Sequence, residues 1–152
     1  MTFDDLKRSL CSVLETGEIG TPVSMRVHLQ IPKTRVDVIS ALASIMKLCH
    51  SVTKDVPFTL IARQTSGATQ LNVLVTFVNG RTILATVGSG CVNDSVLELL
   101  LIGNHGIIRL EGESRIDELL LTNDDEIRQW KTAVARSLKE RKQIVVSENC
   151  TQ

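Results

Sequence analysis

Aromatic residues are scarce in this sequence, and basic residues are not in excess. Phe, Trp and Tyr together make up 3% of the 152 residues, and Tyr is absent. Lys and Arg number 17, as do Asp and Glu, so the formal net charge is zero. Proteins that hold nucleic acid normally use a basic surface and often aromatic platforms for base stacking. We therefore expect no nucleic-acid partner, whereas a surface without net charge tolerates self-association.

Long hydrophobic runs and an export signal are also lacking. No apolar stretch approaches the roughly 20 residues of a membrane span, and the N-terminal MTFDDLKRSL is amphipathic and acidic. Such a start does not resemble a signal peptide. The four cysteines and three histidines are scattered, so we expect reduced thiols and no metal site with local ligand spacing. These absences predict a cytoplasmic protein without a membrane partner.

Hydrophobic periodicity predicts helices in three places. They span residues 3–16, 37–50 and about 124–140. Gly17 is placed to end the first helix in a left-handed conformation. Asp37 is placed to cap the second helix, and Asp124 or Asp125 the third.

The remaining apolar segments alternate, or run as short strands between turn residues. These segments are 22–31, 56–63, 71–78, 81–88, 96–103 and 107–112, with a weaker one at 115–122. Asn79-Gly80 is a strong hairpin signal, and we expect the tail from Arg141 to be mostly irregular. The order predicts an α+β fold, with a largely antiparallel open sheet of five to six strands and helices on one face.

The predicted strands carry apolar residues on both faces. In LNVLVTFV (71–78), one face is wholly apolar and the other, which includes Leu74 and Val78, is only half polar. Glu98 is the sole charge in VLELLLIG. If helices cover one face, a second copy of the chain is the simplest cover for the other. The alternatives are that the sheet curls over itself, or that a Thr-rich face is tolerated.

No motif in the sequence carries an obvious catalytic arrangement. The glycine clusters GEIG (17–20), GSG (88–90) and GNHG (103–106) are interpreted as turns, because none opens a helix after a first strand. His105 is interpreted as a solvated turn residue, and no serine has a His and an acid at motif spacing. Residue chemistry alone therefore predicts a binding or assembly module.

One helix has a narrow polar line. In RVDVISALASIMKLCHS (35–51), the polar residues recur three or four positions apart, which places them on one side of a helix. They are Asp37, Ser40, Ser44, Lys47 and His50. Because the rest of the helix is apolar, we expect this line to be its one solvated edge.

Four segments, taken in order, resemble one protein family. They are LETGEIGTPVSMRVHLQ, LNVLVTFVNGRTILATVGSG, LELLLIGNHGIIRLEGE and IRQWKTAVARSLKERKQIVVS. They resemble the C-terminal domain of Gfo/Idh/MocA oxidoreductases, which has a helix ending in G-E-I-G, an N-G hairpin, a G-x-x-G hairpin and a closing helix. The resemblance covers nearly the whole chain and implies a single domain over 1–152. It also implies a homodimer or higher homo-oligomer that pairs through the sheet face.

The family's other half is missing from this sequence. Gfo/Idh/MocA enzymes bind NAD(P) in an N-terminal Rossmann domain with a glycine fingerprint and an E-K-P lysine, and the sequence contains neither. The resemblance therefore implies no cofactor in this chain, and NAD(P) only if a Rossmann-domain partner supplies it.

The family's catalytic pair is also missing. Such domains contribute a His and an Asp from a D-x-G-x-H-x-x-D pattern. With Asp37 on the first acid, Ile39 replaces the Gly, Ala41 replaces the His and Ser44 replaces the Asp. Lys47 falls where the family often has a basic residue. Ala41 and Ser44 cannot relay a proton as an imidazole–carboxylate pair does, so we expect no catalysis from this chain alone.

Three functions are compatible with these observations. The leading hypothesis is a catalytically silent, freestanding domain that acts in oligomerisation or in binding a partner or small ligand. The first alternative is the C-terminal half of a split or truncated NAD(P)-dependent oxidoreductase. The second is a small-molecule sensor, with Asp37, Ser40, Ser44 and Lys47 as ligand-binding candidates.

Overall fold

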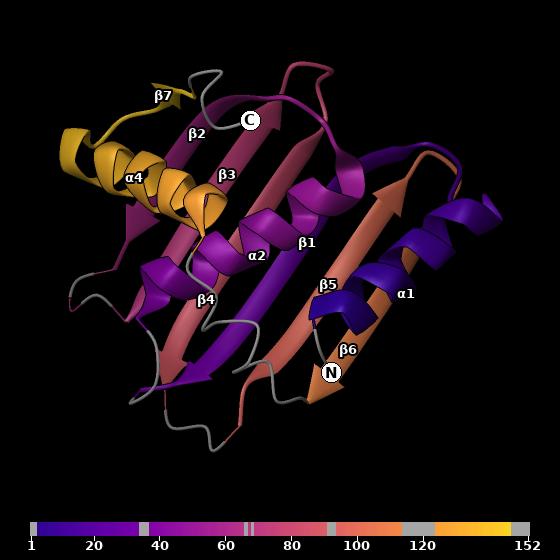
Figure 1. Ribbon diagram of the computed structural model, residues 1–152, viewed down its shortest axis with the longest axis horizontal. Coiled ribbons are helices and arrows are strands. Elements are labelled where there is room, and N and C mark those ends of the chain that lie inside the picture. Colours follow the sequence, from indigo (N-terminus) through magenta and orange to yellow (C-terminus); the bar gives the residue numbers. More distant parts are fainter. Residues whose placement is uncertain are drawn as a thin grey trace.

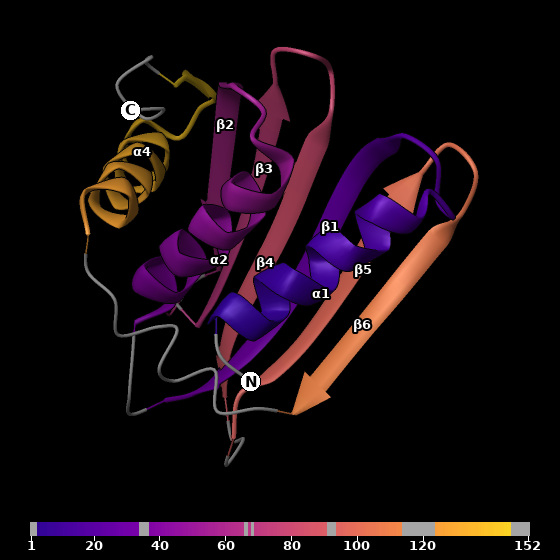
Figure 2. The same cartoon turned by 45° about the vertical axis from the view of Figure 1, so that its right-hand side comes forward.

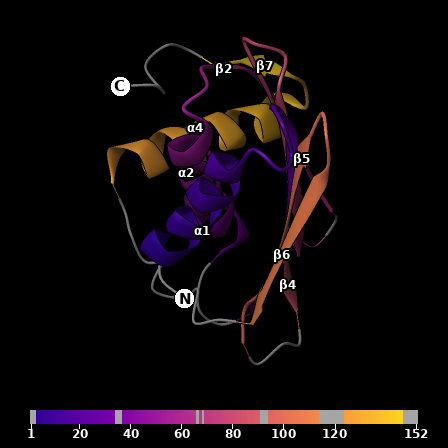
Figure 3. The same cartoon turned by 90° about the vertical axis from the view of Figure 1, so that its right-hand side faces the viewer.

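Helices lie on one face of a single sheet and leave the other face without a helix in the part of the chain described. The computed structural model describes residues 3–33, 37–65, 67, 69–90, 94–113 and 124–146. The helices are α1 (Phe3–Thr16), α2 (Val38–Thr53) and α4 (Asp125–Glu140). Figures 1 and 3 show all of them on the same side of the sheet. This arrangement confirms the predicted α+β fold.

The sheet is largely antiparallel and has seven strands. They are β1 (Pro22–Pro32), β2 (Pro57–Gln64), β3 (Gln70–Phe77), β4 (Thr82–Gly90), β5 (Val96–Gly103), β6 (Ile107–Glu113) and β7 (Ile144–Val145). Their order is β6-β5-β1-β4-β3-β2-β7. The weaker segment predicted at 115–122 lies outside the described residues. The prediction of an irregular tail missed β7, which pairs with Thr59 and Leu60 of β2.

One pair of neighbouring strands, β1 and β4, is parallel. Helix α2 carries the chain from the end of β1 back to the start of β2, so β1 and β2 run in the same direction. Two antiparallel pairings, β2 with β3 and β3 with β4, then return β4 to that direction. The parallel pair at the middle of the sheet therefore follows from one helical crossover and two hairpins.

Two of the three glycine clusters form turns, as predicted, and they dock against each other. His105 N–H donates to the Ile19 carbonyl (2.9 Å) and Asn104 N–H to the Thr21 carbonyl (3.0 Å). Gly103 has to be small, because a Cβ there would lie 2.1 Å from the Ile19 carbonyl oxygen. His105 is exposed in this turn, as predicted.

The third cluster, GSG, was wrongly predicted to be a turn. Gly88, Ser89 and Gly90 belong to β4 and pair with the last residues of β1. A Cβ on Gly88 would lie 2.8 Å from Nε2 of Gln30, so a larger residue there would displace the end of that side chain. The Asn79-Gly80 hairpin between β3 and β4 is confirmed, with Gly80 at a φ of 87°.

The core lies between the helices and the face of the sheet that they cover. Figure 2 shows α4 beside β2, α2 over the middle of the sheet and α1 toward β5 and β6. Leu6 and Leu10 of α1, and Trp130 of α4, are buried in this layer. The wholly apolar face of β3, beginning at Leu71, is buried as predicted. No helix among the described residues is long and apolar enough to cross a membrane.

Candidate functional sites

Helix α2 begins at Asp37, which is its N-cap as predicted. The Asp37 carboxylate accepts hydrogen bonds from the backbone N–H and the hydroxyl of Ser40, both at 2.8 Å. Partial burial opposes ionisation of Asp37, but these bonds and the charge of Lys131 outweigh it, so its pKa is lowered. The helix ends later than predicted, at Thr53, where Lys54 adopts a left-handed conformation (φ 55°). Asp37 and Ser40 thus satisfy each other at the start of the helix.

The two positions that the resemblance aligns with a catalytic His and Asp, Ala41 and Ser44, are inside the protein. Ala41 is 0% exposed and Ser44 is 2% exposed. The Ser44 hydroxyl donates to the Ser40 carbonyl of its own helix at 3.1 Å. Neither position presents a group that could reach a substrate in solvent.

The C-terminal part of the polar line, which is Lys47 and His50, faces α4 rather than water. Lys47 Nζ forms an ion pair with Asp124, and His50 Nδ1 lies 2.8 Å from Glu126 Oε1. The rings of His50 and Trp130 meet edge to face, with centroids 6.3 Å apart. The prediction of a solvated edge was therefore wrong for this part of α2. These contacts form the α2–α4 seam, defined by Lys47, His50, Asp124, Glu126 and Trp130.

Asp124 has two roles in the α2–α4 seam. It is the N-cap of α4, which settles the choice between the two predicted capping acids, and it accepts the Ile127 N–H at 2.9 Å. The hydrogen bond from Lys47 is the largest cause of the lowered pKa of Asp124. The sequence contained a signal for this pairing, because the polar line of one helix carries a lysine and a histidine and the start of another carries acids. The four ligand-binding candidates all have partners within the protein, and their role toward a ligand stays a prediction.

The thiols and other side chains offer no metal site among the described residues. No group of three or more His, Cys, Asp or Glu side chains there could hold an ion. Cys11 and Cys49 are free thiols, while Cys91 and Cys150 lie outside the described residues. Complete burial raises the pKa of Cys49 to about 12, so this thiol is not an activated nucleophile.

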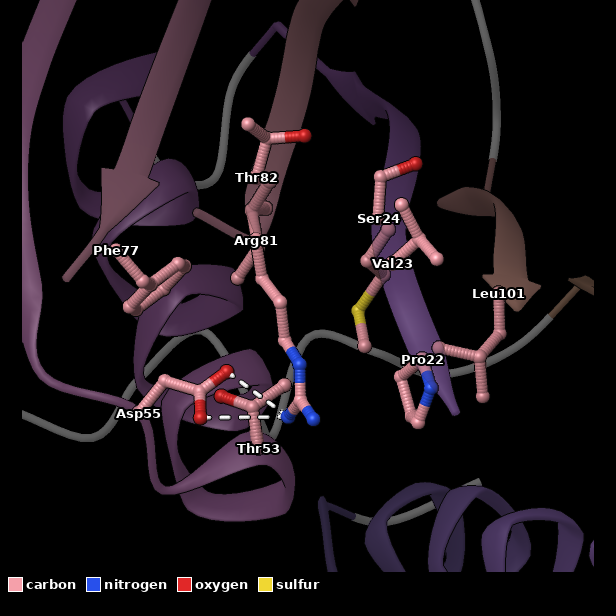
Figure 4. Close-up of a pocket in the computed structure, with 11 residues that line it drawn as sticks. Pro22, Val23, Ser24, Thr53, Asp55, Phe77, Arg81, Thr82 and Leu101 are labelled. Carbon is pink, nitrogen blue, oxygen red and sulfur yellow. Dashed lines mark hydrogen bonds and ion pairs between the residues drawn. The ribbon is translucent and has the colours of Figure 1, made fainter. Parts of the chain in front are cut away.

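A small pocket lies where β1 and β4 begin, next to the end of α2 (Figure 4). Arg81 and Asp55 form an ion pair at its side (3.3 Å), and Asn79 Nδ2 donates to the same carboxylate at 2.9 Å. The other lining residues include Pro22, Val23, Thr53 and Leu101. Its volume of about 10 Å³ holds no more than one water molecule. The ion pair and the hydrogen bond at its side join the β3–β4 turn to Asp55, just after α2. The pocket itself is too small for a substrate.

The face of the sheet opposite the helices, called the open face below, is organised in transverse rows. Strand register defines the apolar row, which from β6 to β2 is Arg109, Leu100, Arg26, Leu84, Leu74 and Ile61. The adjacent polar row is Glu111, Glu98, His28, Thr86, Asn72 and Arg63. The apolar row therefore carries leucine and isoleucine side chains interrupted by two arginines, whereas the adjacent row is polar throughout.

A shallow hollow, the central hollow, lies where both rows cross β5, β1 and β4. Its lining includes Arg26, His28, Leu84, Thr86, Glu98 and Leu100. Glu98 is paired with Arg109 at 3.0 Å, and the Thr86 hydroxyl donates to Asn72 at 2.8 Å. Residue chemistry did not predict this hollow, because it depends on which strands become neighbours.

Comparison with known proteins identifies the fold. No protein-family model matches the sequence, and none of the curated proteins matches it. Among solved structures, GenD2 from gentamicin A biosynthesis in complex with NAD superposes with a TM-score of 0.72 at 15% identity. The match covers 93% of this chain and 60% of that one. This chain therefore shares its fold with about three fifths of GenD2.

Two further structures give the same result. The myo-inositol dehydrogenase from Lactobacillus casei, in complex with NAD(H) and myo-inositol, has a TM-score of 0.70 at 16% identity and covers 96% of this chain and 61% of its own. A probable dehydrogenase from Thermotoga maritima has a TM-score of 0.70 at 12% identity, with 95% and 62% covered. This chain thus spans about three fifths of the length of these three solved structures. Identities this low show a shared fold alone.

Proposed function

We propose that this chain is a non-catalytic assembly domain that forms a homodimer through the open face of its sheet. The apolar row carries this proposal. Leu74 and Leu84 each remain 39% exposed at the middle of the sheet, with Leu100 and Ile61 in the same row. Leu84, Leu74 and Ile61 are neighbours in this row, and an exposed apolar cluster of this kind is typical of a protein–protein contact.

The open face is also large enough for a stable dimer. Strand β7 is only two residues long, so the face is counted over the five spacings from β6 to β2. At about 4.8 Å each, and with strands of about eight residues at about 3.3 Å per residue, they give roughly 630 Å². Standard interfaces bury about 600–1,000 Å² on each partner. Pairing through a sheet face is also what the resemblance to Gfo/Idh/MocA C-terminal domains implies.

The non-catalytic part of the proposal is supported by the interior of α2. The positions that match the family's proton-transfer residues hold Ala41 and Ser44, which are buried. Lys47, the nearest cation on α2, is paired with Asp124. The helix thus uses its polar groups to cap itself and to bind α4.

Light scattering coupled to size-exclusion chromatography tests the assembly role. We expect the wild-type chain to elute as a dimer and Leu84→Glu to elute as a monomer with an unchanged circular dichroism spectrum. Ala135→Glu is the control, because Ala135 is exposed on α4, on the helix side of the sheet. A wild-type chain that stays monomeric at high concentration would contradict the proposal.

A second candidate function is the substrate-side half of an NAD(P)-dependent oxidoreductase. It is favoured by the matched structures, which include dehydrogenases with bound NAD and are longer than this chain. An NADH fluorescence titration separates the two functions. The assembly role predicts no saturable change for this chain alone, while cofactor-dependent activity on mixing with a Rossmann-domain protein would support the second candidate.

A further inference from the structure

Arg26 interrupts the apolar row at the centre of the open face. In register, Leu100 of β5 and Leu84 of β4 lie on its two sides. Arg26 is exposed, and its guanidinium makes no ion pair or hydrogen bond with any described residue. The charge of an arginine between two leucines has to stay in contact with water or form an ion pair with a carboxylate.

A dimer through the open face would remove water from Arg26. Burying an unpaired charge costs more free energy than one leucine contact returns. The cost falls sharply if a carboxylate meets the guanidinium, ideally through two parallel hydrogen bonds. The partner surface must therefore present an acid opposite the central hollow.

The open face contains such an acid in Glu98. Glu98 lines the same central hollow as Arg26, and its side chain is 41% exposed although it is paired with Arg109. A carboxylate has about four lone-pair sites and can accept a second guanidinium. The acids that strand register places on this face in β6, Glu111 and Glu113, lie toward the edge of the sheet, and Glu111 does not line the hollow. Glu98 is thus the acid that shares the hollow with Arg26.

A two-fold axis turns these two residues into a self-complementary pair. In an isologous interface, if residue i contacts residue j of the partner, then j also contacts i of the partner. We propose that Arg26 of each copy enters the central hollow of the other and pairs with Glu98 of the partner subunit. The inference rests on the proposed function. It adds that two symmetry-related ion pairs fix how the two sheets align, and that the partner on the open face is a second copy of this chain.

Charge reversal at the two positions tests the pairing. Arg26→Glu alone places two carboxylates opposite each other, and Glu98→Arg alone places two guanidinium groups together. We expect each variant to dimerise at least about 30-fold more weakly than wild type, because breaking a desolvated charge pair has effects of this size. Arg8→Glu is the matched control. Arg8 is on α1, on the helix side of the sheet, and its side chain is 78% exposed.

Mixing the two variants gives the decisive measurement. A heterodimer of one Arg26→Glu chain and one Glu98→Arg chain contains two opposite-charge pairs, whereas each homodimer contains two like-charge pairs. Native mass spectrometry of the mixture should therefore show heterodimer in at least about ten-fold excess over either homodimer. Thermal unfolding of each variant checks that the monomer fold is intact.

The outcomes distinguish this inference from the proposed function. If Leu84→Glu abolishes the dimer but neither charge reversal weakens it, the Arg26–Glu98 pairing is wrong and assembly through the open face stands. If each reversal weakens the dimer but the mixture shows no preference for the heterodimer, Arg26 has another partner and the inference is also wrong. A wild-type monomer at all concentrations overturns both.

Discussion

Ser137 of α4 forms a hydrogen bond with the backbone of β2 near the edge of the sheet. Removing its hydroxyl should measurably lower the free energy of unfolding. The side chain is 0% exposed. Its oxygen accepts the backbone N–H of Ala62 in β2 at 3.0 Å, and its hydroxyl donates to the Lys142 carbonyl at 2.7 Å. The edge of β2 next to this point is paired with β7. One hydroxyl thus completes the cover over an otherwise unpaired part of β2.

The stability lost in Ser137→Ala depends on the two backbone groups that lose their hydrogen-bond partner. Ala62 is 0% exposed, so water cannot replace the lost acceptor, and an unsatisfied buried donor costs about 1–3 kcal/mol. Lys142 is exposed, so its carbonyl can bind water instead. Alanine regains about 0.5 kcal/mol through its helix propensity. We expect a net loss of about 1–2 kcal/mol, which lowers Tm by roughly 2–8 °C for a chain of this length.

Urea and thermal unfolding followed by circular dichroism measure this loss. Ser9→Ala is the matched control, because Ser9 is exposed on α1 and its hydroxyl donates to the carbonyl of Asp5 in the same helix. The same substitution there should leave stability within about 0.5 kcal/mol. Amide hydrogen exchange adds a local readout, since protection of the Ala62 N–H should fall in Ser137→Ala. A Ser137→Ala protein as stable as Ser9→Ala would refute the reasoning.

Two further predictions concern titratable groups. Because Asp124 has a lowered pKa in the folded state, it stabilises the fold at neutral pH, and this contribution is lost as the pH falls through that pKa, below about 4. Asp124→Asn keeps an N-capping side chain but loses the charge, so urea unfolding should show a deficit of under about 1 kcal/mol at pH 7 that shrinks steadily as the pH is lowered below about 4; a deficit that does not change as the pH falls would contradict this. For Cys49, burial and a pKa of about 12 predict no alkylation by iodoacetamide at pH 8 until urea unfolds the chain. Peptide mass spectrometry can compare it with the partly exposed Cys11, and equal modification rates in the native protein would show that Cys49 is accessible.

Local features of this fold could be predicted from the sequence because their causes are local. Asp37 caps α2 through a bond three residues away, and the Asn79-Gly80 turn depends on the two residues themselves. Strand alternation likewise revealed which side of β3 is buried. These predictions need only backbone geometry and side-chain size.

Features that join distant segments could not be predicted in the same way. The α2–α4 seam pairs Lys47 with Asp124, 77 positions apart. The polar line of α2 by itself indicates a solvated edge, because nothing in it shows that α4 packs there. The glycines of GSG are turn formers by composition, but β1 pairs with this segment and makes it strand. Strand β7 is two residues long, which is too short for any periodicity to indicate.

The position of β1 in the sheet has a consequence for how the chain folds. Strands β2, β3 and β4 are joined by hairpins, as are β5 and β6, so each group can form from neighbouring segments soon after collapse. Strand β1 lies between β4 and β5, although it comes earlier in the chain than both. The two groups become one sheet only when β1 enters between them, and its pairing with β5 closes a loop of some 70 residues. Because long-range closure is slow, we expect insertion of β1 to be the late and rate-limiting step of folding.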